Sequence, residues 1–397
     1  MGLCNAFTNL EVPEGYYDEL GAVLLTHPLQ QFDWQEPAVH AMSRAEAIMQ
    51  SPVSSGDKVL VGGWEQRLLG CTMKQLHALG FMTMAAAQSS SGWVPTGWLG
   101  HDDVRVLLAE LGLTVEESEC LYRRHFVQDR AAFRGKLLPG TAVPGVLRRF
   151  TFNPLVARPV IELPGDRHLA PVPEAMVLKL SPRSFYQQGL DLWGTQFSTE
   201  MGHRFECYVG RQLRVMQQHQ PGLLVEREIT YAVRGSQAKS VDWIVTTPTT
   251  VVLIETKTTQ PTEEVRAGDN AASVKSLRHA LKQISATRDL IVGRHPAFEH
   301  IPDDRDIVGM VVTLGDHYTL NMPPVRDYLG LASDLPVAIE GVQAIEGAAT
   351  SPRDFGRVVS EAIKTGSPLR KVDAEQINPI LDEVWRAGLQ GALESHR

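Results

Sequence analysis

The chain has 397 residues, of which 43% are hydrophobic and 21% are charged, and its formal net charge is −8. This composition excludes a disordered or fibrous protein, and the length predicts two or three globular domains. The negative charge argues against a protein that coats nucleic acid, but it is compatible with an enzyme that has a local basic groove beside a cluster of acids.

Residues 1–150 have the pattern of a mainly helical N-terminal domain. Apolar residues recur at helical spacing over 36–51 and over 101–126, and a polar loop separates the two stretches. Trp93 and Trp98 lie in that loop, and we expect them to anchor it to a core, with stacking on bases as the alternative. The domain is a candidate for recognising a substrate or a partner.

The pattern changes after the first 150 residues. Residues 151–192 are rich in proline and predict an irregular linker with one short strand at 159–163, which makes them a candidate domain boundary. We expect an α/β domain over 193–335 and amphipathic helices over 336–397 that pack on it. The elements expected are a helix at 198–218, strands at 223–233, 241–247 and 251–257, a turn or short loop at 235–240, a helix at 271–292, a strand at 307–314, and C-terminal helices near 351–366 and 373–395.

The N-terminal sequence and the absence of a long apolar stretch indicate a soluble, cytoplasmic protein. Residues 1–15 lack the features of a signal peptide, and no stretch approaches the roughly 18 apolar residues of a membrane helix, so we expect no membrane partner. Cys4, Cys71, Cys120 and Cys207 form no Cys-x-x-Cys pair. We therefore expect buried free thiols rather than disulfides or a zinc finger.

The strand expected at 251–257 ends in charged residues after an apolar run. Because side chains alternate along a strand, Val251, Leu253, Glu255 and Lys257 share one face. Apolar residues on both faces are typical of a sheet covered by helices on each side, where an isolated charge is costly. We therefore expect Glu255 and Lys257 at the lip of a cleft, where the strand emerges.

Asp242 lies on the preceding expected strand, 13 positions before Glu255. A turn near Thr247 lets the two strands pair as a hairpin, which brings both carboxylates to one edge of the sheet. Two close carboxylates repel unless a cation neutralises them, and Mg²⁺ takes one or two carboxylates together with waters and phosphate oxygens. Such an ion activates bound water, and Lys257 can orient that water or stabilise charge on a phosphate. The alternative is an exposed hairpin whose Glu–Lys pair contributes little.

Asp242 followed by Glu255-Thr256-Lys257 resembles the motif of the PD-(D/E)XK nuclease superfamily, which has the restriction-endonuclease-like fold. The order helix, β-hairpin, strand, helix, strand is also similar to that fold over roughly residues 193–316. The resemblance implies an α/β fold with a central mixed β-sheet flanked by helices. It further implies a metal-dependent nuclease, a phosphodiester hydrolase in which Asp242 and Glu255 bind Mg²⁺ (or Mn²⁺ in its place) and Lys257 acts on the attacking water.

Two further site residues follow from the resemblance. Glu206 lies in a helix that resembles the first helix of many members, where a glutamate adds to the metal site. Gln283 resembles a helical glutamine that some branches use near the site. Those branches often have Tyr four residues later, where this chain has Thr287, and Val241 stands where the motif has Pro.

Glu206 competes with Glu200 for the role of the helix glutamate. The two are six residues apart, about 240° around a helix, so they do not share a face. Glu206 lies beside the apolar stripe and can face the sheet, with a surface salt bridge as its alternative role. Glu200 is expected in the first turn, where the helix dipole explains an acid.

Basic residues provide candidate contacts to nucleic acid. Lys275, Arg278 and Lys282 share one face of the helix expected at 271–292, and the alternative is an ordinary solvated face. Residues 122–136 and the pair Arg148-Arg149 are further basic clusters.

The resemblance suggests DNA as the substrate and bacterial anti-phage defence or DNA processing as the biological role. It is also compatible with a protein partner or a homo-oligomer. The alternative is a catalytically inactive nuclease-like module that binds nucleic acid or a protein partner. The chain has no G-x-S-x-G, H-E-x-x-H or phosphate-binding P-loop sequence, which argues against other common hydrolases.

Overall fold

A computed structural model describes residues 36–53, 58–137, 153–233, 235–259, 271–317, 319–331, 333–366, 369 and 378–387. This part of the chain combines helices with mixed β-sheets, so the expected α/β class is confirmed. No helix within it is long and apolar enough to cross a membrane.

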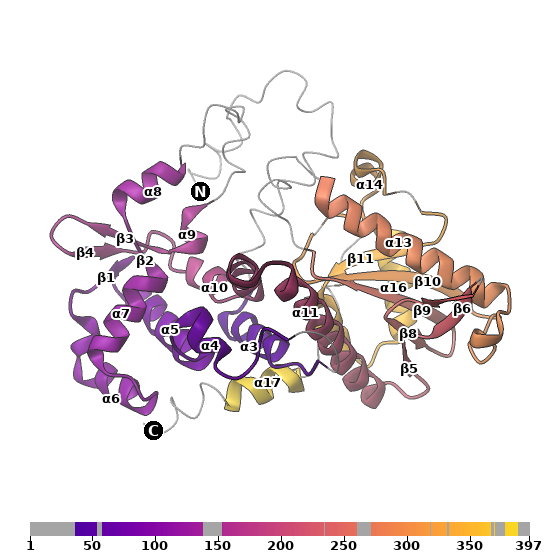
Figure 1. Cartoon of the computed structure of the whole chain (residues 1–397), viewed down its shortest axis with the longest axis horizontal. Coiled ribbons are helices and arrows are strands. Elements are labelled where there is room, and N and C mark those ends of the chain that lie inside the picture. The colour runs from indigo at the N-terminus through magenta and orange to yellow at the C-terminus, as the bar shows by residue number, and fades with distance from the viewer. Residues whose placement is uncertain are drawn as a thin grey trace, which may run out of the picture.

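The N-terminal part is mostly helical and also contains a small sheet (Figure 1). Its strands lie in the order β1-β4-β3-β2. They are β1 (Trp93–Val94), β2 (Val127–Asp129), β3 (Val160–Leu163) and β4 (Arg167–Leu169). The helices are α3 (Ala38–Met49), α4 (Trp64–Leu69), α5 (Met73–Ser89), α6 (Asp102–Glu110), α7 (Val115–Phe126), α8 (Arg130–Leu137), α9 (Pro154–Ala157) and α10 (Ala175–Lys179), with a 3₁₀ turn η2 at Trp98–Gly100.

The helical pattern over 101–126 forms two helices, α6 and α7, rather than one continuous stretch. Gly112 has a φ of 68°, a left-handed conformation that interrupts a right-handed helix. Thr114 then caps α7, because its hydroxyl accepts a hydrogen bond from the Glu117 amide and the Glu117 carboxylate accepts one from the Thr114 amide.

The expectation of an irregular linker is wrong for residues 153–192, although the short strand predicted there is present as β3. This segment also contains α9, β4 and α10, and it begins the long helix α11 (Pro182–His219). Pro154 and Pro182 stand at the first positions of α9 and α11. Proline at that position starts a helix, because its fixed φ suits the helix and its missing N–H would have no partner there.

The larger sheet has five strands in the order β11-β10-β9-β8-β5. β9 is parallel to β10, and β10 to β11, whereas β8 is antiparallel to both β9 and β5. The strands are β5 (Leu224–Arg227), β8 (Trp243–Thr246), β9 (Thr250–Lys257), β10 (Asp306–Thr313) and β11 (Val337–Gly341).

The strand expected at 223–233 is divided. Its second half forms β6 (Thr230–Val233), which pairs with β7 (Ser236–Lys239) as a separate two-stranded ribbon. The expectation of a turn or short loop over 235–240 is therefore wrong, because most of that segment is β7.

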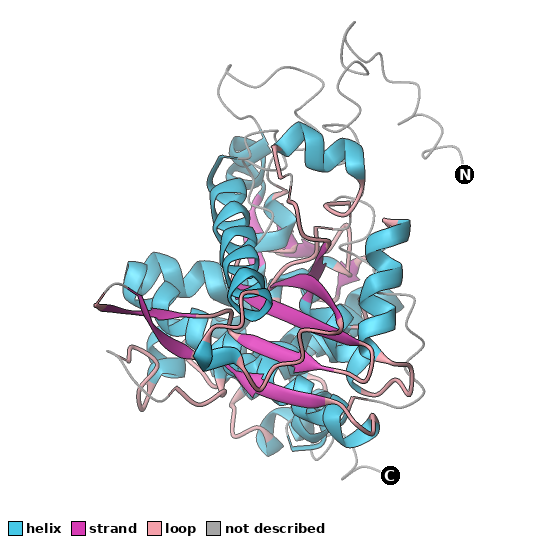
Figure 2. Cartoon of the chain, turned by 90° about the vertical axis from the view of Figure 1, so that its right-hand side faces the viewer, coloured by secondary structure: helices cyan, strands magenta, loops and turns pink. Residues whose placement is uncertain are grey.

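Helices lie on both sides of the larger sheet (Figure 2). Val252 and Ile254 of β9 belong to the core formed with α11, α15 (Val342–Ala349) and α16 (Phe355–Thr365). Val251 and Leu253 belong to the core formed with α13 (Ala271–Val292) and α14 (Pro323–Leu329). The expected alternation of β9 is thus confirmed for its apolar residues.

The N-terminal part and the sheet region share one hydrophobic cluster that extends through α11. Buried polar contacts cross the same junction: the Arg44 guanidinium donates to both carboxylate oxygens of Glu346, and the Tyr208 hydroxyl donates to Glu346 Oε1 at 2.6 Å. The C-terminal helix α17 (Pro379–Trp385) packs on α3, whereas we expected it on the sheet region (Figure 1). The division into domains stays a prediction.

The cysteines meet the expectation in part. Cys71, Cys120 and Cys207 are free thiols, and Cys4 lies outside the described residues. Cys71 is buried, whereas Cys120 is exposed on α7 and Cys207 is half-buried.

Candidate functional site

Strand register brings carboxylates from three neighbouring strands into one row. Trp243 of β8 lies opposite Ile254 of β9, and continuing this register by one residue places Asp242 opposite Glu255. On the other side of β8, the Glu228 amide donates to the Asp242 carbonyl at 2.9 Å, which extends the β5–β8 pairing to Glu228. Asp242 therefore lies between Glu228 and Glu255. Sequence reasoning missed Glu228, because the change of strand after β5 has no local signal.

Thr256 holds the Asp242 carboxylate in place. Its backbone amide and its hydroxyl both donate to Asp242 Oδ2, at 2.7 and 2.6 Å. Sequence reasoning treated Thr256 as the variable position of the motif and assigned it no role. The two bonds leave Asp242 Oδ1 as the oxygen that Thr256 does not engage.

Glu255 is buried beside a lysine that reaches solvent. The Glu255 residue is 1% exposed, whereas the Lys257 side chain is 20% exposed. The Lys257 ammonium pairs with Glu255 Oε1 and donates to Gln283 Oε1 at 3.3 Å. Glu255 Oε2 is buried and has no hydrogen-bond partner among the described residues. A buried carboxylate oxygen without a donor is costly, and a bound cation would supply what it lacks.

Glu206 and Glu200 lie in different surroundings. Glu206 is half-buried and accepts a hydrogen bond from Arg227 at 3.0 Å. The expectation that Glu200 lies in the first turn is wrong, because α11 begins at Pro182 and bends at Gly194. Glu200 is buried in mid-helix, where it accepts hydrogen bonds from the Val59 and Leu60 amides and pairs with Arg204. It therefore joins α11 to the N-terminal part.

Burial and mutual repulsion raise the pKa of the clustered acids. Burial, and then the nearby Asp242 carboxylate, raise the pKa of Glu255 to about 7, against the opposing effect of Lys257. Burial also raises the pKa of Asp242, although the hydrogen bonds from Thr256 oppose this. The pKa of Glu206 is raised by burial and then by Asp242. Burial and repulsion thus favour the protonated acids, or a bound cation that replaces the protons.

The arrangement suits an ion that needs few protein ligands. The carboxylate oxygens of Asp242, Glu255 and Glu206 do not all lie within 4.8 Å of one another. Among the described residues, the potential ligand atoms of Glu162, Asp166 and His168 do. Mg²⁺ often takes only one or two carboxylates and keeps several waters. Asp242 and Glu255 can hold such an ion directly, and Glu206 can reach it through water.

The two departures from the superfamily pattern are in contact with each other. The Val241 amide donates to the Thr287 hydroxyl at 3.1 Å, and both residues are buried. A proline at position 241 has no N–H to donate, and a tyrosine at position 287 would not fit the same short contact. Val241 and Thr287 thus anchor the start of β8, one residue before Asp242, to α13.

The three basic residues proposed to contact nucleic acid differ in whether their side chains bind other parts of the chain. Lys275 and Lys282 are exposed on α13, the helix that carries Gln283. Arg278 is also exposed, but its guanidinium donates to the carbonyls of Leu329 and Gly330 at the end of α14.

The basic stretch at 122–136 is engaged within the N-terminal part only in part, because Arg124, Arg130 and Arg134 are exposed. Tyr122 and Phe126 are buried, and Arg123 pairs with Glu119, Glu162 and Asp166. Arg148 and Arg149 lie outside the described residues. Trp98 is buried, as expected, whereas Trp93 is exposed and lies under the Arg167 guanidinium.

Comparison of this chain with models of known protein families, with curated proteins and with solved structures finds no match.

Proposed function

We propose that this chain is a Mg²⁺-dependent nuclease of the restriction-endonuclease-like type that hydrolyses phosphodiester bonds, with DNA as the substrate. The observation that carries the proposal is the pairing of Asp242 opposite Glu255, with Lys257 beside them and one buried Glu255 oxygen unpartnered. Burying two acids and a base at the ends of two interior strands destabilises the folded chain. The same three groups suit the hydrolysis of a phosphodiester.

Each residue has a distinct part in this proposal. Asp242 and Glu255 hold the ion, which when bound lowers the pKa of water and offsets charge on the phosphate. Thr256 fixes the Asp242 carboxylate through its two hydrogen bonds. The Lys257 side chain is 20% exposed, and its ammonium can donate to the attacking water or to a phosphate oxygen. Gln283 positions that ammonium from the other side.

Exposed lysines support an approach of the substrate along α13. Lys275 and Lys282 lie on the same helix as Gln283, which contacts the site lysine. Lysines of this kind bind the phosphate backbone and carry no information about base sequence. In this proposal, the local positive charge of α13 allows a chain whose net charge is −8 to bind nucleic acid.

The test is cleavage of plasmid, linear duplex DNA, single-stranded DNA and RNA in the presence of Mg²⁺, Mn²⁺ or a chelator. We expect metal-dependent cleavage of DNA by the native chain and a loss of at least about 100-fold in Asp242→Asn, Glu255→Gln and Lys257→Ala. The matched controls are Glu226→Gln, an acid on β5 that pairs with His300, and Lys364→Ala, an exposed lysine on α16. Both controls should cleave like the native chain.

The outcomes separate the two candidate functions. Equal cleavage by the native chain and by folded Asp242→Asn and Lys257→Ala would reject the assignment of the site. A native chain that cleaves none of the substrates, yet binds one of them in a manner sensitive to Lys275→Ala and Lys282→Ala, would favour a non-catalytic binding module.

A further inference from the structure

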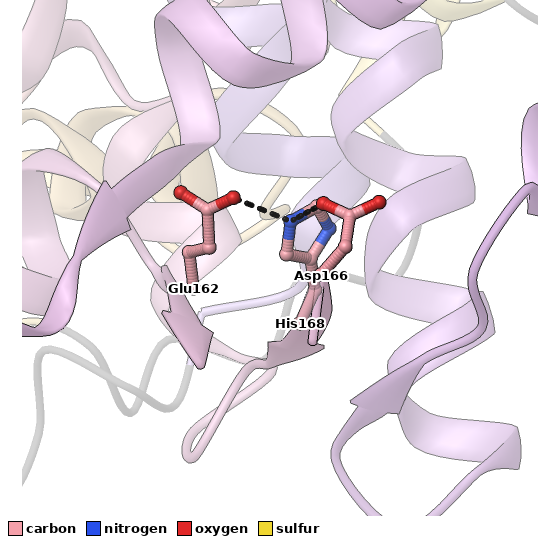
Figure 3. A group of neighbouring side chains, drawn as sticks. All are labelled: Glu162, Asp166 and His168. Carbon is pink, nitrogen blue, oxygen red and sulfur yellow. Dashed lines mark ion pairs between the residues drawn. The ribbon is translucent and has the colours of Figure 1, made fainter. Parts of the chain in front are cut away.

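A second group of metal-binding side chains lies in the N-terminal sheet, apart from the Asp242 site. In the hairpin of β3 and β4, Glu162 lies directly opposite His168, and Asp166 lies in the turn between the strands. Figure 3 shows the His168 ring between the two carboxylates. One ligand atom from each of the three residues lies within 4.8 Å of the others.

His168 is placed as metal-binding histidines are. The residue is 6% exposed, and its Nδ1 is 3.0 Å from the Tyr122 hydroxyl. This contact orients the ring, and with Nδ1–H donating to the Tyr122 hydroxyl, Nε2 keeps a lone pair for a metal, as is usual in metal sites. Nε2 is buried and has no hydrogen-bond partner among the described residues. This nitrogen points toward Glu162 Oε1 at 3.9 Å and Asp166 Oδ1 at 3.7 Å, which is too long for hydrogen bonds.

Charge around the hairpin also favours a cation. Glu119, Glu162 and Asp166 surround one guanidinium, that of Arg123, at 2.7, 3.1 and 2.8 Å. One positive charge therefore faces three carboxylates. Each carboxylate oxygen has more than one lone pair, so Glu162 and Asp166 can accept from Arg123 and also bind an ion.

We propose that Glu162, Asp166 and His168 form a binding site for Zn²⁺. With bonds of about 2.0 Å in a tetrahedral arrangement, two zinc ligands lie about 3.3 Å apart. The observed separations of 3.7 and 3.9 Å from Nε2 exceed this by only a few tenths of an ångström. An imidazole nitrogen favours zinc over Mg²⁺. Glu162 and Asp166 are partly exposed, which leaves the fourth position to water.

The ion would connect β3, the turn and β4, and through Tyr122 it would join the hairpin to α7. The site lies in a different sheet from Asp242 and Glu255. The inference is independent of the proposed nuclease activity.

The experiment measures Zn²⁺ binding to the full chain by titration calorimetry, after chelator treatment and in millimolar Mg²⁺. Asp242→Asn serves as the parent, so that the candidate nuclease site does not contribute. We expect one Zn²⁺ per chain in the parent, and binding at least about 100-fold weaker when Glu162→Gln and Asp166→Asn are added. Asparagine suits position 166, because the φ of 53° there is left-handed and asparagine tolerates it.

The matched control is Glu119→Gln, which removes a carboxylate from the same arginine without removing a ligand. It should bind Zn²⁺ within about threefold of the parent, whereas His168→Gln should lose binding as the double variant does. X-ray absorption spectroscopy of the zinc-bound parent, recorded at the zinc edge, should show one imidazole nitrogen among oxygen ligands. A folded parent that does not bind Zn²⁺, or a folded double variant that binds it like the parent, would overturn the proposal.

Discussion

Proton release on Mg²⁺ binding tests whether the buried Glu255 carboxylate is a ligand. Its pKa is raised to about 7, so a large fraction of metal-free protein holds a proton there near neutral pH. The ion requires the ionised carboxylate, and binding must therefore expel that proton. From a pKa of about 7 we expect release of about 0.9 proton per ion at pH 6 and about 0.1 at pH 8.

The Glu255 proton also sets the pH dependence of the affinity for Mg²⁺. Because Mg²⁺ competes with it, the apparent dissociation constant should be about tenfold higher at pH 6 than at pH 8. Asp242, whose pKa is also raised, strengthens the trend at the acidic end. Calorimetric titration in two buffers of different ionisation enthalpy measures the number of protons released at each pH.

Two variants make the assay specific. Glu255→Gln should abolish the binding and the proton release together, and Glu226→Gln, on the edge strand β5 of the same sheet, should change neither. Release that stays below about 0.2 proton at pH 6, in a native chain that binds Mg²⁺, would refute the argument that Glu255 is protonated in the free site.

Three predictions concern stability, measured by urea unfolding. In chelator, Glu255 should contribute a loss of about 3 kcal/mol in the free energy of unfolding between pH 4.5 and pH 8, because the folded state keeps its proton up to about pH 7 while the unfolded state releases it near pH 4.5. The native chain should therefore lose about 3 kcal/mol more over this range than Glu255→Gln, and an equal change in both proteins would contradict the prediction. Thr287→Val leaves the buried Val241 amide without an acceptor and should cost about 1–3 kcal/mol, against no significant change for Thr199→Val on the exposed side of α11. Gly210→Ala would place a Cβ 2.1 Å from Trp243 Cζ2 and should lower the free energy of unfolding by about 1–3 kcal/mol. Gly202→Ala, with no atom within 4 Å of its Cβ, should be neutral or slightly stabilising. Similar values for the two glycines would show that the sheet adapts to the extra methyl group.

Local pattern was sufficient where neighbouring residues decide the structure. The apolar residues on both faces of β9 predicted a strand covered on both sides, and α13 and β10 lie close to their expected positions. The Asp242–Glu255 pairing was also predictable, because a short turn between two strands sets their register. The side-chain period of two then placed Lys257 on the same face as Glu255.

Tertiary contacts decided the rest. Glu228 joins the row of acids only because β5 pairs with β8, and the end of β5 within a continuous alternating pattern has no local signal. The apolar stripe of the helix separated Glu206 from Glu200, but it carried no sign that the N-terminal part supplies two backbone amides to Glu200.

The sequence by itself thus determined which residues of the central strand are buried and which charged pair ends it, because alternation and turn length are properties of adjacent residues. Only the tertiary structure decided which other acids meet that pair, and that Glu162, Asp166 and His168 meet one another, because strand pairing and helix docking depend on contacts between distant segments.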